Sequence, residues 1–346
     1  MNPAIPRPGK IILFRTDRLG DLVLSFPVVE SLRASYPEAR VDFFVSPSTA
    51  PLARLQRHVS DVIEDRFSGP RGLADCVRLL RARGYDMAVH IYPRPRLALA
   101  AFLSRIPVRI GTAYRFYSPL FNQRVKVTRK RMTAHELDLN LRLIEAVAPP
   151  IRPVSFGIVV PERAQAEVDT LLAACGIGGP GSCFVVLHPS SGGSSLQWPP
   201  EHFGELGRAL LARGIPVVLT GVEADRPVVD QVRSVAGEAA VDLCGRCDLE
   251  HLAALLVRAS LLVSNSTGPL HLADALGTRV IGLYSPFRSS SPARWGPYSQ
   301  RRNVFVPKGE ICRHCTRDRC KDYNCMGGIR VEEVLREALR LITQDL

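Results

Sequence analysis

Long apolar runs are missing from this sequence of 346 residues. No uninterrupted apolar stretch reaches the ~18 residues that a membrane-spanning helix needs, and the first apolar segment is too short for a signal peptide. Aromatic residues make up only 7% of the chain, and no helix-turn-helix, RNP-like or basic-aromatic pattern accompanies the pI of about 9.6. We therefore expect a cytoplasmic protein that does not bind nucleic acid.

Lysine is also scarce, because only 5 of the 45 basic residues are lysine. Arginine suits bidentate binding of phosphate or carboxylate groups, although a bias in codon usage would produce the same excess. Residues 1–163 hold 26 basic and 14 acidic residues, a net charge of +12, whereas residues 164–346 hold 19 of each. The whole positive excess belongs to the first half, which suits an anionic partner for that half.

What the sequence does contain is a repeated alternation of strand and helix patterns. Its length suits two domains, since single cores stop growing beyond about 250 residues. Strands that alternate with helices indicate parallel βαβ units and an α/β fold. Strands are expected at Lys10–Arg15, Arg40–Val45, 62–63, 87–91, 183–188, 216–220, 261–264 and 279–283. Helices are expected at 21–36, Gly72–Arg83, 134–147, 200–213, 225–235, 248–258, 269–276 and 330–342.

Proline and glycine cluster between residues 146 and 182, where we place the junction between the domains. The expected parts are a first domain at 1–165, a second domain at 166–329 with a cysteine-rich loop at 312–325, and a terminal helix at 330–346. That helix is amphipathic, and we expect its apolar face to pack back on the first domain.

A Gly-x-Gly-x-x-Gly pattern occurs at Gly176, Gly178 and Gly181. A dinucleotide-binding fingerprint follows a strand and begins a helix, whereas this pattern precedes a strand. We interpret it as part of the linker between the domains, which argues against a nicotinamide-dependent dehydrogenase.

A polar turn, Arg15-Thr-Asp-Arg-Leu-Gly-Asp21, follows the first expected strand. An acid at the start of a helix complements the helix dipole, but that role does not account for a polar, glycine-containing loop at the carboxyl end of a strand. Residues 12–44 resemble the opening of bacterial heptosyltransferases, which form glycosyltransferase family 9.

Two later loops carry the same resemblance. Residues 189–199, Pro-Ser-Ser-Gly-Gly-Ser-Ser-Leu-Gln-Trp-Pro, lie between a strand and a helix. Small hydroxyl and glycine residues in that position suit a diphosphate. Residues 264–277, Ser-Asn-Ser-Thr-Gly-Pro-Leu-His-Leu-Ala-Asp-Ala-Leu-Gly, resemble the most diagnostic signature of the family. The resemblance spans nearly the whole chain.

This resemblance implies a GT-B fold, in which two Rossmann-like domains with parallel sheets face each other across a cleft. The first domain would bind the acceptor and the second a nucleotide sugar. The implied reaction is metal-independent, inverting transfer of heptose from ADP-heptose to an anionic glycolipid such as the lipopolysaccharide inner core, with no cofactor required for catalysis. The enzyme would work in the cytoplasm, in peripheral contact with the inner face of the cytoplasmic membrane.

The resemblance also assigns roles to individual residues. Asp21 is the expected general base, because it lies where it could reach an acceptor hydroxyl. Arg15 and Arg18 are expected to bind the acceptor. The residues expected to bind the donor are Ser190, Ser191, Gln197, Glu223, Ser266, Thr267, Gly268 and His271.

Two positions depart from the family pattern. Leu196 stands where the family commonly has a lysine, and Ser266 stands where it has an acid. Arg288 or Arg294 could supply the missing positive charge. The alternatives are a family-9 enzyme with a different nucleotide sugar or a protein acceptor, and a member that binds a sugar nucleotide without transferring the sugar.

Cysteine forms one dense cluster, Cys312, Cys315, Cys320 and Cys325. Four thiols meet the ligand count of a structural zinc or iron site, although the spacing differs from that of paired Cys-x-x-Cys ribbons. A structural metal, a redox-labile pair and the reduced thiols usual in the cytoplasm are all open.

Overall fold

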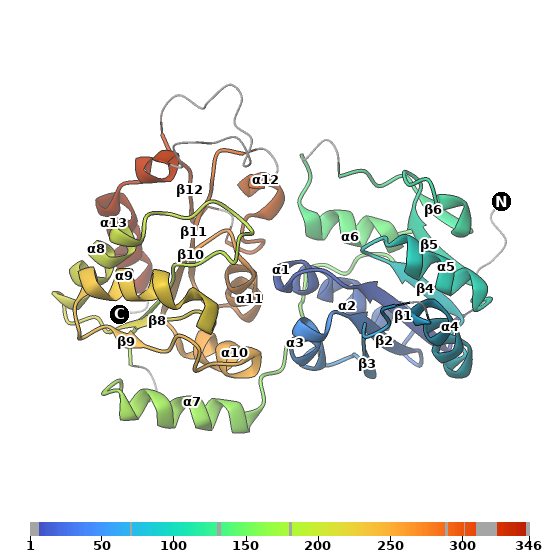
Figure 1. Ribbon diagram of the computed structural model, residues 1–346, viewed down its shortest axis with the longest axis horizontal. Coiled ribbons are helices and arrows are strands. Elements are labelled where there is room, and N and C mark those ends of the chain that lie inside the picture. The colour runs from blue at the N-terminus through green and yellow to red at the C-terminus, as the bar shows by residue number, and fades with distance from the viewer. Residues whose placement is uncertain are drawn as a thin grey trace. The chain divides into compact units, whose positions relative to one another are not determined.

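The computed structural model describes residues 7–69, 71–129, 133–179, 182–287, 290–300, 302–308 and 324–343. The chain divides into two compact units, Met1–Val159 and Val160–Leu346 (Figure 1). The division lies just before α7 (Glu162–Ala174), which packs on α10 (Leu249–Arg258) of the second unit. The boundary expected after residue 165 would cut this helix, so the structural division is a few residues earlier.

The first unit is built on a six-stranded, fully parallel sheet with the order β3-β2-β1-β4-β5-β6. Its strands are β1 (Lys10–Arg15), β2 (Arg40–Val45), β3 (Asp61–Glu64), β4 (Met87–His90), β5 (Val108–Thr112) and β6 (Gln123–Val125). Its helices are α1 (Leu19–Val23), α2 (Phe26–Ser35), α3 (Ala50–Arg54), α4 (Gly72–Arg83), α5 (Pro95–Leu103) and α6 (Glu136–Ile144), with short 3-10 turns η1 (Pro47–Thr49) and η2 (Ser118–Leu120).

The second unit has its own six-stranded parallel sheet, with the order β12-β11-β10-β7-β8-β9. Its strands are β7 (Val185–His188), β8 (Val217–Leu219), β9 (Val241–Asp242), β10 (Leu261–Asn265), β11 (Val280–Leu283) and β12 (Val304–Phe305). Besides α7 and α10, its helical elements are α8 (Pro200–Leu211), η3 (Glu223–Asp225), α9 (Arg226–Ala236), α11 (Gly268–Leu276), α12 (Pro292–Trp295), η6 (Asn324–Gly328) and α13 (Val331–Ile342).

Both sheets follow the same Rossmann topology. If the strands of each unit are numbered 1 to 6 along the chain, both sheets have the spatial order 3-2-1-4-5-6; for the second unit this order runs from β9 to β12. In such sheets the strand order reverses between the first and fourth strands, and ligands bind outside the carboxyl ends of the strands at that switch point. The switch points lie between β1 and β4 in the first unit and between β7 and β10 in the second.

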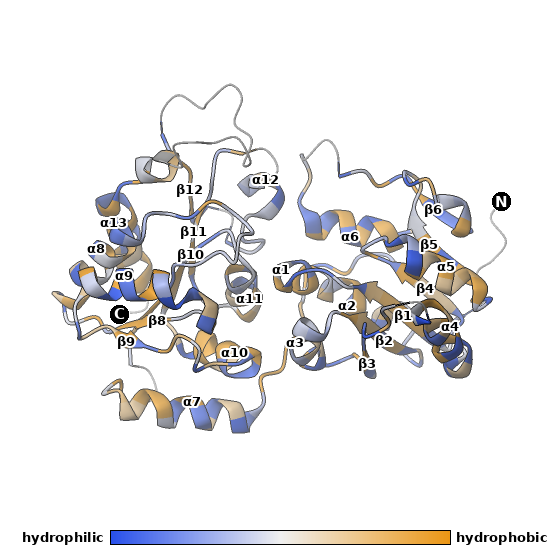
Figure 2. Cartoon of the chain, viewed as in Figure 1, coloured by the Kyte–Doolittle hydropathy of each residue, from blue (hydrophilic) through white to orange (hydrophobic). Residues whose placement is uncertain are grey.

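The core of each unit is the hydrophobic layer on both faces of its sheet, as parallel sheets require. In the first unit Ile11, Ile12, Leu13 and Phe14 of β1 are fully buried. Figure 2 shows the hydrophobic colour along β1 and β2, whereas α7 carries both hydrophobic and hydrophilic residues. The burial fixes where each strand ends, and so it fixes where the loops at its carboxyl end begin.

The terminal helix α13 corrects one expectation from the sequence. Its apolar residues Val334, Ala338, Leu341 and Ile342 belong to the core cluster of the second unit, and the helix packs on α8. The face expected to contact the first domain is therefore already covered within the second unit.

Two further expectations change in detail. The helix expected over 21–36 is divided into α1, which ends at Val23, and α2, which has Ser25 as its N-cap and Pro27 in its first turn. The glycines at 176–179 connect α7 to β7 inside the second unit, so they are not a linker between domains. Among the described residues, no helix combines the length and the apolar content that crossing a membrane would take.

Candidate functional site

The carboxyl end of β1 holds a buried guanidinium surrounded by carboxylates, which we name the β1 cluster: Arg15, Asp17, Asp21 and Glu136. Arg15 is only 1% exposed. Its Nη2 atom donates a hydrogen bond of 2.6 Å to Oδ1 of Asp21 and lies 3.8 Å from Oε1 of Glu136. The side chain of Asp21 is 20% exposed. Arg15 therefore fixes the carboxylate of Asp21 while part of that side chain faces solvent.

Asp17, like Glu136, is a member of the β1 cluster to which the sequence assigned no role. Its Oδ1 atom lies 2.9 Å from Nε of Arg15, yet neither atom has a hydrogen-bond partner of good geometry among the described residues. Burial raises the pKa of Asp17 to about 7, against the opposing effect of Arg15. Asp17 can therefore gain or lose a proton near neutral pH, directly beside the Asp21 site.

Glu136, at the start of α6, joins the β1 cluster from a distant part of the chain. Nε of Arg129 donates a hydrogen bond of 2.7 Å to Oε1 of Glu136, and Nη2 of Arg129 donates one of 2.9 Å to Oδ1 of Asn140. Nδ2 of Asn140 in turn donates to the carbonyl oxygen of Leu24 at 3.0 Å. The last of these bonds attaches α6 to the segment between α1 and α2. No local sequence signal links residues so far apart.

The two arginines expected to bind the acceptor differ in their surroundings. Arg15 is buried and its guanidinium is directed at the carboxylates of the β1 cluster. Arg18 lies at the N-terminal boundary of α1 and is exposed. Of the two, only Arg18 presents its positive charge to solvent.

At each switch point one strand ends in a buried histidine. His90 ends β4 and stacks on Phe14 with ring centroids 4.5 Å apart, and burial lowers its pKa to about 3. His188 ends β7 with Nδ1 lying 3.0 Å from Oγ1 of Thr220, and burial lowers its pKa to about 4. Both imidazoles are therefore neutral at physiological pH and supply no charge for an anionic ligand.

In the second unit Asn265, the last residue of β10, fixes both ends of the loop that follows β7. Nδ2 of Asn265 donates a hydrogen bond of 2.6 Å to the carbonyl oxygen of Pro189, and Oδ1 accepts one of 2.8 Å from the backbone N–H of Trp198. Trp198 is fully buried, and its Nε1 donates to the carbonyl oxygen of Ile329 at 2.9 Å. The sequence placed Asn265 within a family signature but gave no sign of this positioning role.

The hydroxyl groups of the loop after β7 have partners of their own. Ser190 donates a short hydrogen bond to Oδ1 of Asp225, which also accepts from the backbone N–H of Val222 through Oδ2 at 2.9 Å. Ser191 donates to the carbonyl oxygen of Ser195 at 2.8 Å and accepts from Nε2 of Gln197 at 3.3 Å. Three residues expected to bind the donor, Ser190, Ser191 and Gln197, are thus held together in one loop.

The loop after β10 leads directly into α11, and it contains the remaining residues of the signature. Thr267 is the N-cap residue of α11 and its Oγ1 lies 2.9 Å from Oγ of Ser264, while Gly268 is the first residue of the helix. The carbonyl oxygen of Ser266 accepts a hydrogen bond of 3.3 Å from Oγ of Ser194. The structure therefore brings the β7 and β10 loops into contact, with the N-terminal amides of α11 beside them.

Leu196, which replaces the expected lysine, is 6% exposed and belongs to the hydrophobic core of the second unit. Arg294 has an aromatic neighbour that contacts the start of α11. Its guanidinium lies 4.6 Å from the ring centre of Trp295, and that ring lies 6.3 Å from the ring of His271. Arg294 thus lies beside the first turns of α11, whereas Arg288 falls outside the described residues.

Glu223 lies in η3, after β8, one strand away from the switch point. Its side chain is 74% exposed, and its Oε2 atom lies 3.3 Å from Nη2 of Arg226. An exposed carboxylate at the same edge of the sheet as the β7 loop is accessible to a ligand.

Three of the clustered cysteines, Cys312, Cys315 and Cys320, lie outside the described residues. Cys325 is half-buried and packs against the core of the second unit. Across the described part of the chain, no three His, Cys, Asp or Glu side chains are grouped closely enough to hold a metal ion.

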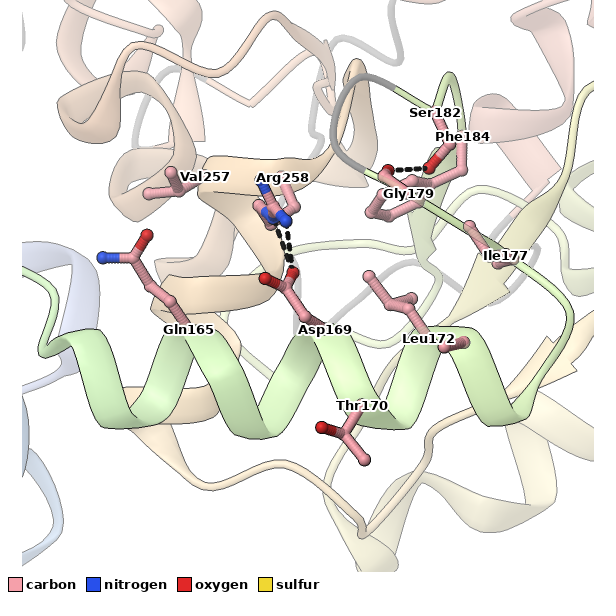
Figure 3. Close-up of a pocket in the computed structure, with 11 residues that line it drawn as sticks. Gln165, Asp169, Thr170, Leu172, Ile177, Gly179, Ser182, Phe184, Val257 and Arg258 are labelled. Carbon is pink, nitrogen blue, oxygen red and sulfur yellow. Dashed lines mark hydrogen bonds and ion pairs between the residues drawn. The ribbon is translucent and has the colours of Figure 1, made fainter.

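A cavity of about 600 Å³ lies between α7 and the end of α10, lined in part by Asp169, Leu172, Phe184 and Arg258 (Figure 3). Asp169 and Arg258 form an ion pair of 2.6 Å across it. Phe184 precedes β7, so the cavity is at the amino end of the sheet, opposite the loops of the switch point. It contains none of the expected site residues.

Comparison with solved structures supports the fold. A glycosyltransferase of family 9 from Veillonella parvula superposes with a TM-score of 0.82 at 21% identity, covering 96% of this chain and 97% of that one. The Escherichia coli ADP-heptose lipopolysaccharide heptosyltransferase II superposes with a TM-score of 0.79 at 21% identity, covering 97% of this chain and 99% of that one. Together with the two parallel sheets, this likeness confirms the expected GT-B fold.

Comparison of sequences leads to the family. Lipopolysaccharide heptosyltransferase 3 of Escherichia coli is 25% identical over 94% of this chain and 96% of its own length. The family model for glycosyltransferase family 9 (heptosyltransferase) matches residues 74–325, well over half of the chain. This chain, with its family signature at the switch points of two Rossmann-like sheets, belongs to glycosyltransferase family 9.

Proposed function

We propose that this glycosyltransferase moves heptose from ADP-heptose to an anionic glycolipid such as the lipopolysaccharide inner core, with inversion and without a metal. The names of its relatives support this choice, since they include lipopolysaccharide heptosyltransferases and an enzyme named for ADP-heptose. The observation that carries the proposal is that the expected acceptor and donor residues, except Glu223, follow the strands at the switch points of the two sheets, where α/β proteins bind ligands.

Asp21 is the proposed general base. Its carboxylate would accept the proton of the acceptor hydroxyl while that oxygen attacks the anomeric carbon and the nucleoside diphosphate leaves from the opposite face. Arg15 contacts Asp21 directly, so we assign Arg15 the role of orienting the base. Acceptor binding then falls to Arg18, which is exposed.

The donor diphosphate would lie between the β7 loop and the start of α11. Backbone N–H groups at a helix N-terminus attract anions, and hydroxyls of Ser190, Ser191 and Thr267 would stabilise the negative charge that develops on the leaving group. Glu223 would contact the ribose. Because Leu196 is buried in the core, Arg294 is the proposed cation at this site.

Asp21→Asn tests the base. Turnover should fall by about 10²–10⁴, the usual contribution of general-base catalysis, while the affinity for the donor changes little. Asp75→Asn is the matched control, because Asp75 lies on α4 and is 43% exposed. Wild-type turnover in Asp21→Asn, measured with a verified donor and acceptor, would remove Asp21 from the mechanism.

Thermal shift with ADP-heptose and with ADP-, UDP- and GDP-linked hexoses tests the donor. ADP-heptose should raise the melting temperature most, because only a ligand of the folded state stabilises it. A larger shift with another sugar nucleotide would support a different donor, and a shift without transfer to any acceptor would support a protein that only binds sugar nucleotides.

The proposed peripheral contact with the cytoplasmic membrane rests on the charge of the first unit and on the lipid-borne acceptor.

A structural metal at Cys312, Cys315, Cys320 and Cys325 is a separate proposal, independent of the transfer chemistry, and metal analysis of the purified chain would test it.

A further inference from the structure

A turn at the carboxyl end of β5 holds two aromatic rings in solvent. Phe116 is 87% exposed and Tyr114 is 55% exposed. The ring of Phe116 meets the buried ring of Tyr117 edge-on, with centroids 5.0 Å apart. A single exposed apolar side chain is ordinary, but two aromatic rings on one turn form an apolar projection that packing within this unit does not explain.

The turn is held rigidly. Oγ of Ser118 accepts a hydrogen bond of 2.9 Å from the backbone N–H of Arg115 and donates one of 2.6 Å to the carbonyl oxygen of Thr112. Oη of Tyr117 donates to the carbonyl oxygen of Pro93 at 2.7 Å. Phe116 is therefore presented on a fixed support, so its exposure is a property of the fold.

Three cations flank the rings. Arg115 lies between them in sequence. Lys126 directly follows Val125, whose carbonyl oxygen accepts a hydrogen bond of 2.9 Å from the backbone N–H of Ala113, the residue before Tyr114. Arg94 follows Pro93, to which Tyr117 is bonded. Arg94, Arg115 and Lys126 are all exposed, and none of the three forms an ion pair with a described residue.

This surface adjoins the β1 cluster. The guanidinium of Arg94 lies 4.6 Å from the ring centre of Tyr92, and the guanidinium of Arg15 lies 6.0 Å from the centre of the same ring. The turn after β5 and the turn after β1 also share the carboxyl edge of one sheet. A partner bound at Phe116 would thus lie on the side of the first unit that presents Asp21.

We propose that Arg94, Tyr114, Arg115, Phe116 and Lys126 form a docking surface for an anionic lipid bilayer. Aromatic rings settle at the boundary between headgroups and acyl chains, and unpaired arginine and lysine side chains bind headgroup phosphates. Phe116 enters the boundary region while the three cations remain at the phosphate level, as in other interfacial attachments that combine apolar and basic groups. The net charge of +12 on residues 1–163 is complementary to such a surface.

The inference rests on the proposed function in one respect, because docking there would present a lipid-borne acceptor at the edge of the sheet that carries Asp21. The docking itself requires neither donor nor acceptor. Binding to vesicles and sugar transfer can therefore be measured separately on the full chain.

Sedimentation with vesicles tests the surface. Wild-type protein should bind vesicles of phosphatidylglycerol and phosphatidylcholine in a salt-sensitive way and should bind phosphatidylcholine alone weakly. Phe116→Ser should weaken binding about tenfold, as expected for one large apolar side chain, and Arg115→Gln about fivefold. Phe102→Ser is the matched control, because Phe102 is 45% exposed but lies at the end of α5, before β5 begins, and it should bind as wild type does.

Insertion itself is visible in Phe116→Trp. The emission of the new tryptophan, taken as the difference from wild type, should shift to shorter wavelength on anionic vesicles and be quenched by brominated acyl chains. Phe102→Trp should show neither change. Wild-type vesicle affinity in Phe116→Ser, or an unquenched tryptophan at 116, would overturn the proposal. So would a dimer of the wild-type chain in the absence of lipid that Phe116→Ser dissociates, because the occupant would then be a second copy.

Transfer to a deacylated, water-soluble acceptor separates the two proposals. Phe116→Ser should retain wild-type transfer to that acceptor and lose transfer to the same acceptor embedded in vesicles. If the wild-type chain transfers no sugar but still inserts Phe116 into anionic vesicles, the proposed function fails while the docking surface stands.

Discussion

At the scale of single residues, the first site is organised around one buried arginine. A buried guanidinium is costly unless carboxylates compensate its charge, and Arg15 is surrounded by Asp17, Asp21 and Glu136. The candidate base therefore shares its cation with two other acids. Any change in the charge of Asp17 alters the electrostatic field at Asp21, so the ionisation of Asp17 affects the carboxylate of the candidate base.

Asp17 makes stability depend on pH in a definite direction. Its pKa is about 7 in the folded chain, well above the ordinary value of about 3.9 for an unfolded chain. Between these values the folded state retains a proton that the unfolded state releases, so the free energy of unfolding falls as pH rises through that window. Asp17→Asn should therefore be more stable, relative to wild type, at about pH 7.5 than at about pH 5. Urea unfolding at both pH values measures this, and a difference that is independent of pH would contradict it.

Arg294 is the proposed replacement for the lysine that is absent at position 196, and it would supply the positive charge of the donor site. Arg294→Gln should raise the KM for the sugar nucleotide about tenfold or more, since charge-assisted bonds to phosphate contribute about 1.5–3 kcal/mol. Arg302→Gln is the control, because Arg302 is exposed just before β12. Equal KM values in the two variants, from steady-state kinetics, would exclude Arg294 from the site.

At the scale of elements, local periodicity predicted the longer strands and helices well. β1, β2 and α4 have the bounds expected from their patterns, since a run of buried residues is bounded by polar turns. The edge strands β9 and β12 are only two residues long, too short for any alternation. Thr267 and Asp21 were predicted as site residues because they lie in local signatures, and their roles stay predictions. Glu136 contributes to the β1 cluster only through the tertiary fold.

Gly157 lies where the chain passes close to the buried side chains of Glu30 and Gln56. Its φ is +61°, and a Cβ there would overlap the carboxylate of Glu30 and the amide of Gln56. Nε2 of Gln56 donates to Oε1 of Glu30 at 2.7 Å, and both side chains are buried. Gly157→Ala should therefore lower the melting temperature clearly, because it adds a steric clash to the backbone strain.

Gly176→Ala is the matched control for that prediction. Gly176 has a φ of +77° but nothing within 4 Å of the position of a Cβ, so it carries the strain without the clash. Equal decreases in melting temperature in the two variants, measured by calorimetry, would contradict the prediction, because the side chains of Glu30 and Gln56 would then have moved aside for the added methyl group without cost.

At the scale of the whole molecule, each unit has its own sheet, its own core and its own candidate site. ADP should therefore slow amide hydrogen exchange in residues 189–198 and at the start of α11, because a bound ligand stabilises the elements that contact it. The segment from β1 to α1 should exchange as it does without ADP. Mass spectrometry of peptides from both units measures this, and protection confined to the first unit would reverse the proposed roles.

The packing of α13 within the second unit has an evolutionary consequence. Because the terminal helix stays with its own unit, each unit is one uninterrupted stretch of sequence that meets the other at Val159 and Val160. A single genetic crossover near that point exchanges an entire unit, with its candidate site, without cutting a hydrophobic core. In such a lineage, the proposed acceptor site and the proposed sugar-nucleotide site can be inherited from different ancestors.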